Sequence, residues 1–396
     1  MSIQKHRRSN EHDYNQGSKL LKQVPDEIME LILQRLNIFD YLAFRQVCRS
    51  WHAISKRCSP APQLPWLLFD SDPFHIQDHC LVSCLSDPRT HYSVPPKLFY
   101  ESRCLGSVEG WLIMAARIHR SSPVVNLLLN PISGCRVELP PLSTISGPRS
   151  TRLDFLRKAV ASFEQTRLEQ CLVASLCDAG RLAFCRNIDE SWTLVKARER
   201  NVVLRFEDVE IIDGKLYAAT THSTLMVFNI QGVTYTAERV VKLPYFGIYY
   251  HTGPYIAKDV ATKDLFIVYS RSIASSNHSI IVYDLPSRTR YHTRAFRVFK
   301  LECDNSDDPH CVEVFDLGNR TLFVNDLGTK IISSSSDLER NCIYYALYRD
   351  YTKESKTDFG VFSLTNKSIK LLTFPGYASL QGFFKGMLVW FTPNPW

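Results

Sequence analysis

The sequence predicts a mainly β protein that begins with a small α-helical domain. Apolar residues recur at helical intervals of three and four only between residues 24 and 54. From residue 63 onward, short apolar runs are separated by Gly, Pro, Asn, Asp and Ser, which is the pattern of strands joined by turns. The chain has 396 residues and 45% hydrophobic content, enough for a sizeable core.

Composition narrows the class of protein. Residues 1–19 are polar and basic, so we expect a disordered tail, and residues 5–8 (KHRR) could alternatively be a weak nuclear signal. No apolar run approaches the roughly 18 residues that span a bilayer, and the start of the chain lacks the apolar core of a secretory signal. The twelve scattered cysteines are expected to be reduced in an intracellular protein of the nucleus or cytoplasm. The net charge of +7 is dispersed, so we expect neither a nucleic-acid nor a membrane partner.

The first predicted helix starts at Pro25, whose fixed φ suits the first helical position. Asp26 and Glu27 follow, where carboxylates favour the positive end of the helix dipole. The apolar residues on one face of this helix have the spacing i, i+3, i+4 and i+8 and are Ile28, Leu31, Ile32 and Leu36.

Asp40 is the predicted N-cap of a second helix, because its carboxylate can accept from free amides. Cys48 is expected to be a small buried apolar residue. The apolar face of this helix is Leu42, Val47, Trp51 and Ile54. The stretch is too short to form a core alone, so we expect its apolar faces to pack either on the following domain or on another protein. Periodicity does not decide between the two.

The whole stretch resembles an F-box, the adaptor-binding motif of SCF-type ubiquitin ligases. The matching residues are Val24-Pro25, Glu27-Ile28, Leu31-Ile32, Arg35-Leu36, Asp40, Arg45, Val47-Cys48 and Trp51. Val24, Ala43 and Phe44 differ from the commonest residues of the motif. The resemblance implies binding to a Skp-family adaptor and, through it, to a cullin–RING ligase. The candidate adaptor-binding residues are Pro25, Ile28, Leu31, Ile32, Leu36, Val47 and Trp51. Some of these are expected to pack internally, and the sequence does not separate the two groups.

The clearest β unit covers residues 206–243. Asp213-Gly214 predicts a type I′ hairpin turn, since that turn needs positive φ. Four antiparallel strands in about 40 residues match the size of a propeller blade. Similar units are predicted at residues 105–139, 159–195, 255–299 and 312–372, with strands that include 280–285 and 312–317.

A sixth unit begins with residues 66–69 and 80–85 and lacks a last strand, which residues 387–391 could supply from the C-terminus. Such a joint would close the ring and remove its free edges. We therefore predict a β-propeller of about six blades. The alternative is a large sandwich or two separate β domains.

This region resembles the KIB-type β-propeller domain that follows the F-box in a large plant family. The carrying segments are residues 130–131, 138–142, 206–209, 214–217, 314–323, 341–345, 360–362 and 390–393. The predicted organisation is a tail at 1–19, an F-box at 20–58 and a propeller at 59–396. The family's domain has no assigned catalytic residues, so the resemblance supplies none.

The sequence contains none of the common phosphate, zinc or nucleophile motifs. Residues 303–311 fail as an EF-hand, because Pro309 stands where glycine is needed, and adjacent Cys and His ligands suit zinc poorly. We therefore expect no metal and no cofactor. His119 and His251 could face a propeller mouth but are more typical of surface residues. The aromatic residues 245–255 fit a contact surface or blade packing equally well.

Three functions remain open. The favoured one is a non-catalytic substrate-recognition subunit of an SCF-type ubiquitin ligase, whose propeller binds an unknown target protein. The alternative is a regulatory protein that sequesters a partner through its propeller without ubiquitination. A propeller enzyme such as a glycosidase is the weakest, since no catalytic constellation is apparent.

Overall fold

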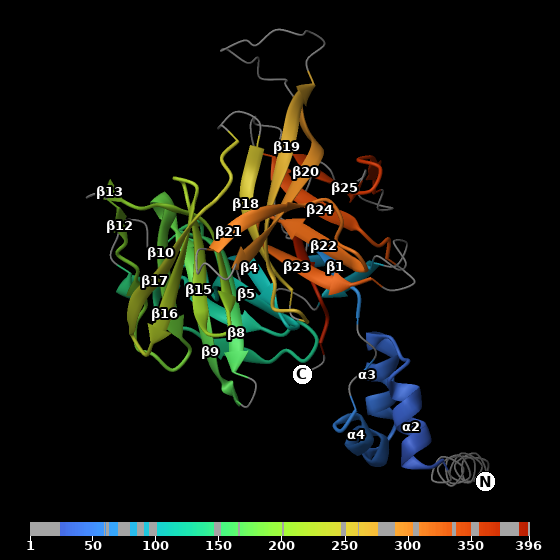
Figure 1. Ribbon diagram of the computed structural model, residues 1–396. Helices are drawn as coiled ribbons and strands as arrows, with labels where there is room; N and C mark the ends of the chain where they lie inside the picture. Colours follow the sequence, from blue (N-terminus) through green and yellow to red (C-terminus); the bar gives the residue numbers. More distant parts are fainter. Residues whose placement is uncertain are drawn as a thin grey trace, which may run out of the picture. The chain divides into compact units, whose positions relative to one another are not determined.

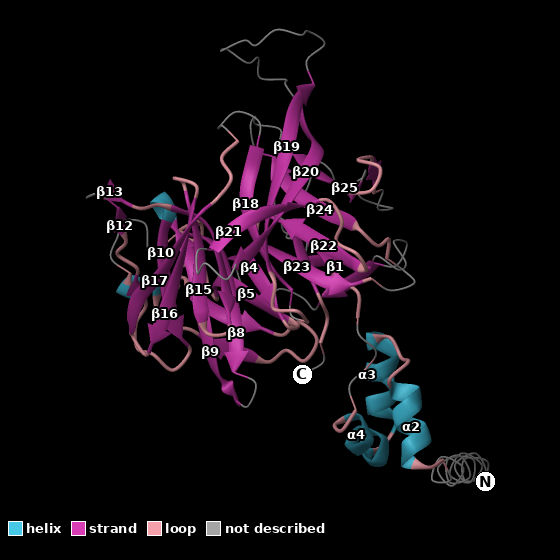
Figure 2. Cartoon of the chain, in the orientation of Figure 1, coloured by secondary structure: helices cyan, strands magenta, loops and turns pink. Residues whose placement is uncertain are grey.

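The computed structural model describes residues 24–58, 60, 63–69, 80–84, 91–94, 101–145, 152–164, 167–199, 202–246, 251–259, 261–275, 290–303, 309–334, 338–349, 356–372 and 388–394. The chain divides into two compact units, a helical unit of residues 1–64 with 393–395 and a β unit of residues 65–392 with 396. Figure 1 follows the chain by colour, and Figure 2 distinguishes the N-terminal helices from the strands. The mainly β class with a small helical N-terminal part is thereby confirmed.

The helical unit contains α2 (Asp26–Leu33), α3 (Ile38–Val47) and α4 (Arg49–Ser55). Helix α3 is capped by Asn37, whose side chain accepts from the backbone amides of Phe39 and Asp40. The prediction that Asp40 is the N-cap is therefore wrong. Asp40 lies in the first turn, where its carboxylate accepts a hydrogen bond of 2.6 Å from the Asn37 amide.

Cys48 divides the predicted second helix in two. Its backbone is extended, with φ −162° and ψ 171°, so α3 ends before it and α4 begins after it. The Cys48 side chain is exposed, with Sγ 3.1 Å from the Ser50 hydroxyl oxygen. The prediction that Cys48 is buried is wrong, because the interruption turns this position away from the helical core.

The described strands of the β unit form six blade-like units and one short hairpin. Two blades are the sheet β4 (Glu101–Val108), β5 (Trp111–Arg117), β6 (Val125–Leu129) and β7 (Arg136–Glu138), and the sheet β8 (Leu156–Glu164), β9 (Arg167–Cys177), β10 (Arg181–Arg186) and β11 (Thr193–Leu194). The hairpin is β12 (Arg198–Glu199) with β13 (Val202–Val203).

The next blade is β14 (Phe206–Ile212), β15 (Lys215–Thr220), β16 (Thr224–Gln231) and β17 (Thr234–Lys242). It confirms the unit predicted at residues 206–243. Asp213 and Gly214, in the turn between β14 and β15, both have positive φ, 48° and 76°, as the predicted turn requires.

Two further blades merge into one nine-stranded sheet. The first is β18 (His251–Asp259), β19 (Leu265–Ser275), β20 (Arg290–Cys303) and β21 (Pro309–Val314). The second is β22 (Arg320–Asn325), β23 (Gly328–Ser333), β24 (Cys342–Arg349), β25 (Lys356–Ser363) and β26 (Ile369–Leu371). Strand β23 joins them, because it pairs in parallel with β18 and antiparallel with β22.

Two strand predictions in this sheet need correction. Residues 312–317 were predicted to open the last of these units, but the strand there is β21, which pairs with β20 and ends the preceding blade. Strand β23 was not predicted at all. The strand predicted at residues 280–285 lies outside the described residues.

The remaining blade confirms that a C-terminal strand joins an N-terminal sheet. Its order is β27 (Leu388–Phe391), β1 (Trp66–Phe69), β2 (Cys80–Cys84) and β3 (His91–Val94), with Trp66 opposite Phe391. The innermost strands contact one another in the cyclic order β27, β4, β8, β14, β18 and β23. The C-terminal strand is thus the innermost strand of its blade rather than the last one, and it closes the ring.

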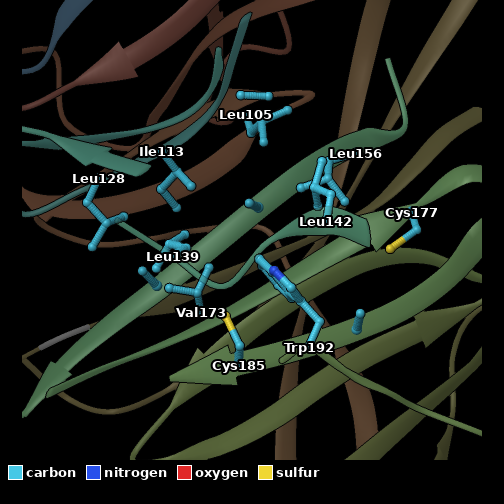
Figure 3. Close-up of a cluster of buried hydrophobic side chains, with 14 of the residues drawn as sticks. Leu105, Ile113, Leu128, Leu139, Leu142, Leu156, Val173, Cys177, Cys185 and Trp192 are labelled. Carbon is cyan, nitrogen blue, oxygen red and sulfur yellow. The ribbon is translucent and has the colours of Figure 1, made fainter. Parts of the chain in front are cut away.

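The core lies between the faces of neighbouring blades. Figure 3 shows apolar side chains from the β4–β7 and β8–β11 sheets meeting, among them Leu128, Val173 and Trp192. Trp192 also donates a hydrogen bond of 2.8 Å from Nε1 to the carbonyl oxygen of Pro140. The innermost strands approach so closely that a Cβ on Gly106 of β4 would collide with the carbonyl oxygen of Ala159 on β8.

Candidate functional site

The helical unit has a closed core of its own. Tyr41 is fully buried, and its hydroxyl donates a hydrogen bond of 2.6 Å to the carbonyl oxygen of Ser55. This bond ties α3 to the end of α4. The buried side chains of the unit include Met29, Leu33, Ile38, Tyr41, Phe44, Ile54 and Cys58.

Five large apolar side chains of the same unit stay exposed. They are between 36% and 53% exposed, and we call them the apolar stripe: Val24, Ile28, Leu31, Ile32 and Val47. Helix α2 therefore carries two stripes, of which Met29 and Leu33 face the core while Ile28 and Leu31 face outward. The inward pair was not predicted from the sequence, although its spacing of four residues is the usual signal of a helix face.

The predicted adaptor-binding residues fall into two groups. Pro25, Ile28, Leu31, Ile32 and Val47 are exposed. Leu36 and Trp51 are half-buried, and the Trp51 ring stacks on the buried Phe44 with centroids 4.2 Å apart. The structure therefore brings five of the seven to the surface and gives Trp51 a packing role.

A second candidate site lies where the innermost strands of several blades begin. This axial pocket has a volume of about 520 Å³ and takes residues from β8, β14, β18 and the turn between β22 and β23. Its lining is Arg157, Ala179, Gly180, Arg205, Phe206, Glu207, Asp208, Thr221, Thr252, Gly253, Pro254, Tyr255 and Asp326.

A buried ion pair supports the pocket from below. Lys158 and Asp208 are 3% and 2% exposed, and the Lys158 ammonium group binds the Asp208 carboxylate directly. Asp208 also accepts from the backbone amides of Val209 and Ile256, at 2.9 and 2.6 Å. Because a buried charge is tolerated only when it is paired and hydrogen-bonded, this carboxylate joins β8, β14 and β18 into one rigid floor.

The rim of the pocket is charged. Arg157, Arg205 and Glu207 are exposed, while Asp326 is half-buried and accepts a hydrogen bond of 3.1 Å from the Tyr255 hydroxyl. Burial and the neighbouring Asp208 raise the pKa of Glu207, and Arg157 opposes that shift. Gly180, at φ +70°, leaves room for Arg205, since a Cβ there would lie 3.0 Å from the Arg205 Cβ.

Further titratable groups lie deeper inside the ring. Burial raises the pKa of Glu210 on β14 to about 7, against the opposing charge of Lys158. Burial lowers the pKa of Lys330 on β23 to about 8, and its ammonium group donates a hydrogen bond of 3.1 Å to the Ser107 hydroxyl. Neither Glu210 nor Lys330 lines the axial pocket.

Other residues singled out from the sequence are placed as follows. His119 is exposed in the turn after β5 and does not line the axial pocket, and His251 is the first residue of β18. Among the aromatic residues at 245–255, Tyr245 is exposed, whereas Tyr255 is buried and the Phe246 ring packs against Tyr269, which agrees with blade packing for these two. Tyr249 and Tyr250 lie outside the described residues, and the contact surface stays a prediction.

Within the part of the chain that the structure describes, no cluster of three His, Cys, Asp or Glu side chains could hold a metal ion. Most of the loop at residues 303–311 lies outside that part. No helix among the described residues has the length and apolarity to cross a membrane.

Comparison with known proteins gives two family matches. A sequence model of the KIB1-4 β-propeller matches residues 81–363, and one of the F-box domain matches residues 21–61. The F-box protein SKIP23 of Arabidopsis thaliana is 24% identical over 413 residues, which cover 94% of each chain. The F-box protein At2g05970 is 21% identical over 367 residues, 88% of this chain and 90% of that one. The F-box protein KIB4 is 32% identical over 148 residues, 35% of each. At2g05970 and KIB4 are also proteins of Arabidopsis thaliana.

Proposed function

Because the chain belongs to the KIB1-4 β-propeller family and carries an F-box domain, we propose that it is the substrate-recognition subunit of an SCF-type ubiquitin ligase. The helical unit binds a Skp-family adaptor, which connects it to a cullin–RING ligase. The propeller binds the target protein. The subunit works in the nucleus or cytoplasm and performs no chemistry of its own.

The apolar stripe is the observation that carries the adaptor-binding part. Its five side chains are exposed although Tyr41, Leu33 and their neighbours already form a complete core. Fully burying a Leu or Ile side chain contributes about 1.5–3 kcal/mol. Since Ile28 and Leu31 are about half exposed, roughly half of that is available to each on binding. A helix face of this kind suits a complementary apolar groove on an adaptor.

The ligase reaction would then depend on proximity. The adaptor side brings a ubiquitin thioester, and the propeller side brings lysine side chains of the target. Holding both in one assembly raises their effective concentration, which accelerates transfer without any catalytic residue in this chain.

The test is a binding assay between the purified full chain and a Skp-family adaptor. Leu31→Asp places a charge in the apolar stripe and is expected to abolish binding. The matched control is Leu371→Asp, which changes a 69%-exposed leucine on β26 of the propeller and should leave binding intact. Loss of binding in both variants, or in neither, would show that the apolar stripe does not bind the adaptor.

The alternative is a regulatory protein that sequesters its partner. Proteasome inhibition in cells distinguishes the two. A ligase subunit accumulates ubiquitinated partners under inhibition, and Leu31→Asp removes that accumulation. A sequestering protein gives the same set of partners, unmodified, whether or not the stripe is intact.

A further inference from the structure

The axial pocket opens at the end of the ring opposite the point where the chain enters the propeller. Strand β1 begins at Trp66, which pairs with Phe391 at the end of β27. The other end of β27, Leu388, accepts a hydrogen bond of 2.9 Å from Asn325, next to the turn that carries Asp326 of the pocket. The pocket therefore lies at the Leu388 end of the ring, away from the entry at Trp66.

Two guanidinium groups in this pocket are held by no hydrogen bond or ion pair within the described residues, although the charge of Arg157 acts on the nearby Glu207. Arg157 on β8 and Arg205, directly before β14, both line it and are both exposed. Some other arginines of the propeller are held by carboxylates, as Arg297 is by Glu313 at 2.5–2.7 Å. Across the described ranges of the chain, neither Arg157 nor Arg205 has a side-chain hydrogen bond or ion pair. Unpaired guanidinium groups in a concave site favour a carboxylate or phosphate ligand.

The acidic residues of the pocket restrict the charge of that ligand. Glu207 and Asp326 lie in the same pocket as the two arginines. The Lys158–Asp208 pair below is neutral overall and already satisfied. The rim is therefore close to charge balance. A ligand group with one negative charge can pair with the arginines, whereas the second charge of a phosphate would meet two carboxylates. Glu207 and Asp326 can in turn accept from a donor next to the anionic group.

We propose that the axial pocket binds a short segment of the target protein in which an Asp or Glu lies beside a hydrogen-bond donor, with Arg157 and Arg205 as the residues that hold its carboxylate. The net charge of +7 also favours encounter with an acidic partner. The identification of this segment as part of a ligase target rests on the proposed function. The binding chemistry of the pocket stands without it.

The probe is a displayed library of random seven-residue peptides, selected against the full chain with and without a Skp-family adaptor. Enriched peptides are expected to contain Asp or Glu. Replacing that residue by Gln or Asn in a synthetic copy should weaken binding about tenfold or more, since hydrogen bonds to charged groups are among the stronger ones. A phosphoserine at the same place should bind less tightly than the carboxylate.

The matched variants are Arg157→Ala/Arg205→Ala and Arg120→Ala. Arg120 is exposed in the turn after β5, near the same end of the ring, and does not line the pocket. The double variant should lose binding about tenfold or more, and Arg120→Ala should lose none. Arg157→Glu/Arg205→Glu should select basic peptides instead. Unchanged thermal unfolding in each variant establishes that the propeller is folded.

Three results would overturn the proposal: enriched peptides without acidic residues, equal binding by the double variant, or tighter binding of the phosphoserine copy. Failure of the proposed function looks different. In that case the adaptor does not bind, while acidic peptides are still selected by the chain alone and still depend on Arg157 and Arg205.

Discussion

The apolar stripe of the helical unit and the rim of the axial pocket expose opposite chemistry. Ile28 and Leu31 are exposed above a core of the same apolar kind, sealed by Tyr41. Arg157 and Arg205 are exposed above a buried ion pair, Lys158–Asp208. In each region the interior is complete without the surface groups. The surface groups are therefore available for partners, through hydrophobic burial in one region and through charge in the other.

Binding at the two surfaces is also expected to depend on salt in opposite ways. Salts that are excluded from the protein surface, such as sulfate, make the burial of apolar area more favourable. Contacts between exposed charges are screened over about 8–10 Å at physiological ionic strength.

The largest expected effect comes from Asp208→Ala. It leaves Lys158 buried without a counter-ion and removes the acceptor of the Ile256 amide. We expect a loss of about 3–5 kcal/mol in the free energy of unfolding, measured by denaturant titration. Lys158→Met/Asp208→Asn, which removes both charges and keeps an acceptor, should cost much less. Equal losses would mean that the charge pair does not support the pocket floor.

Two leucines on α2 give the next effect. Leu33 is fully buried, and Leu33→Ala should lower the free energy of unfolding of the helical unit by about 2–5 kcal/mol. Leu31 is 53% exposed, so Leu31→Ala should leave stability nearly unchanged and weaken adaptor binding by about 1–3 kcal/mol. Thermal unfolding and adaptor titration on the same samples measure both. If Leu31→Ala destabilised the unit as much as Leu33→Ala, the stripe would belong to the core.

Glu210 tests the charged interior through pH. Its folded pKa of about 7 exceeds the unfolded value of 4.5, so the folded protein holds a proton that the unfolded chain releases. This contribution to stability is present below pH 4.5 and is lost as pH rises through 7. The loss is roughly 3 kcal/mol. Glu210→Gln should remove that slope between pH 5 and 7.5, as measured from denaturation midpoints. Lys330, whose pKa is lowered to about 8 and which feels the Glu210 charge, contributes mainly at higher pH. An unchanged slope in the variant would place the titration elsewhere.

Sequence periodicity predicted the helical surface better than the pocket, for a physical reason. Helix faces are set by residues three and four apart, so Ile28, Leu31 and Ile32 could be grouped from the sequence alone. The pocket combines Arg157, Arg205 and Asp326 from separate blades. Only closure of the ring brings them together, and no local pattern encodes that.

The same limit applies to the strands. The unit at 206–243 was predicted because a hairpin turn fixes its register locally. Strand β23 was missed although it forms a local hairpin with β22, and its parallel partner β18 lies some 70 positions earlier in the chain, where no local pattern points to it. The strand near residue 312 was recognised but given to the wrong blade, because it pairs with β20, the strand directly before it in the chain, and so ends that blade.

The smallest expected effect concerns the N-cap of α3, where the sequence predicted Asp40 and the structure has Asn37. Asn37 caps α3 by accepting two hydrogen bonds, of 2.9 and 3.0 Å, from backbone amides, whereas Asp40 lies within the first turn of the helix. Asn37→Ala should lower the free energy of unfolding of the helical unit by about 1 kcal/mol. Asp40→Ala keeps the cap and removes a first-turn carboxylate, which is worth about 0.3–1 kcal/mol. Thermal unfolding of both variants in low salt ranks them, and added salt should shrink the Asp40 effect alone because the dipole contribution is screened. A larger loss in Asp40→Ala that persists in high salt would restore Asp40 as the cap that the sequence predicted.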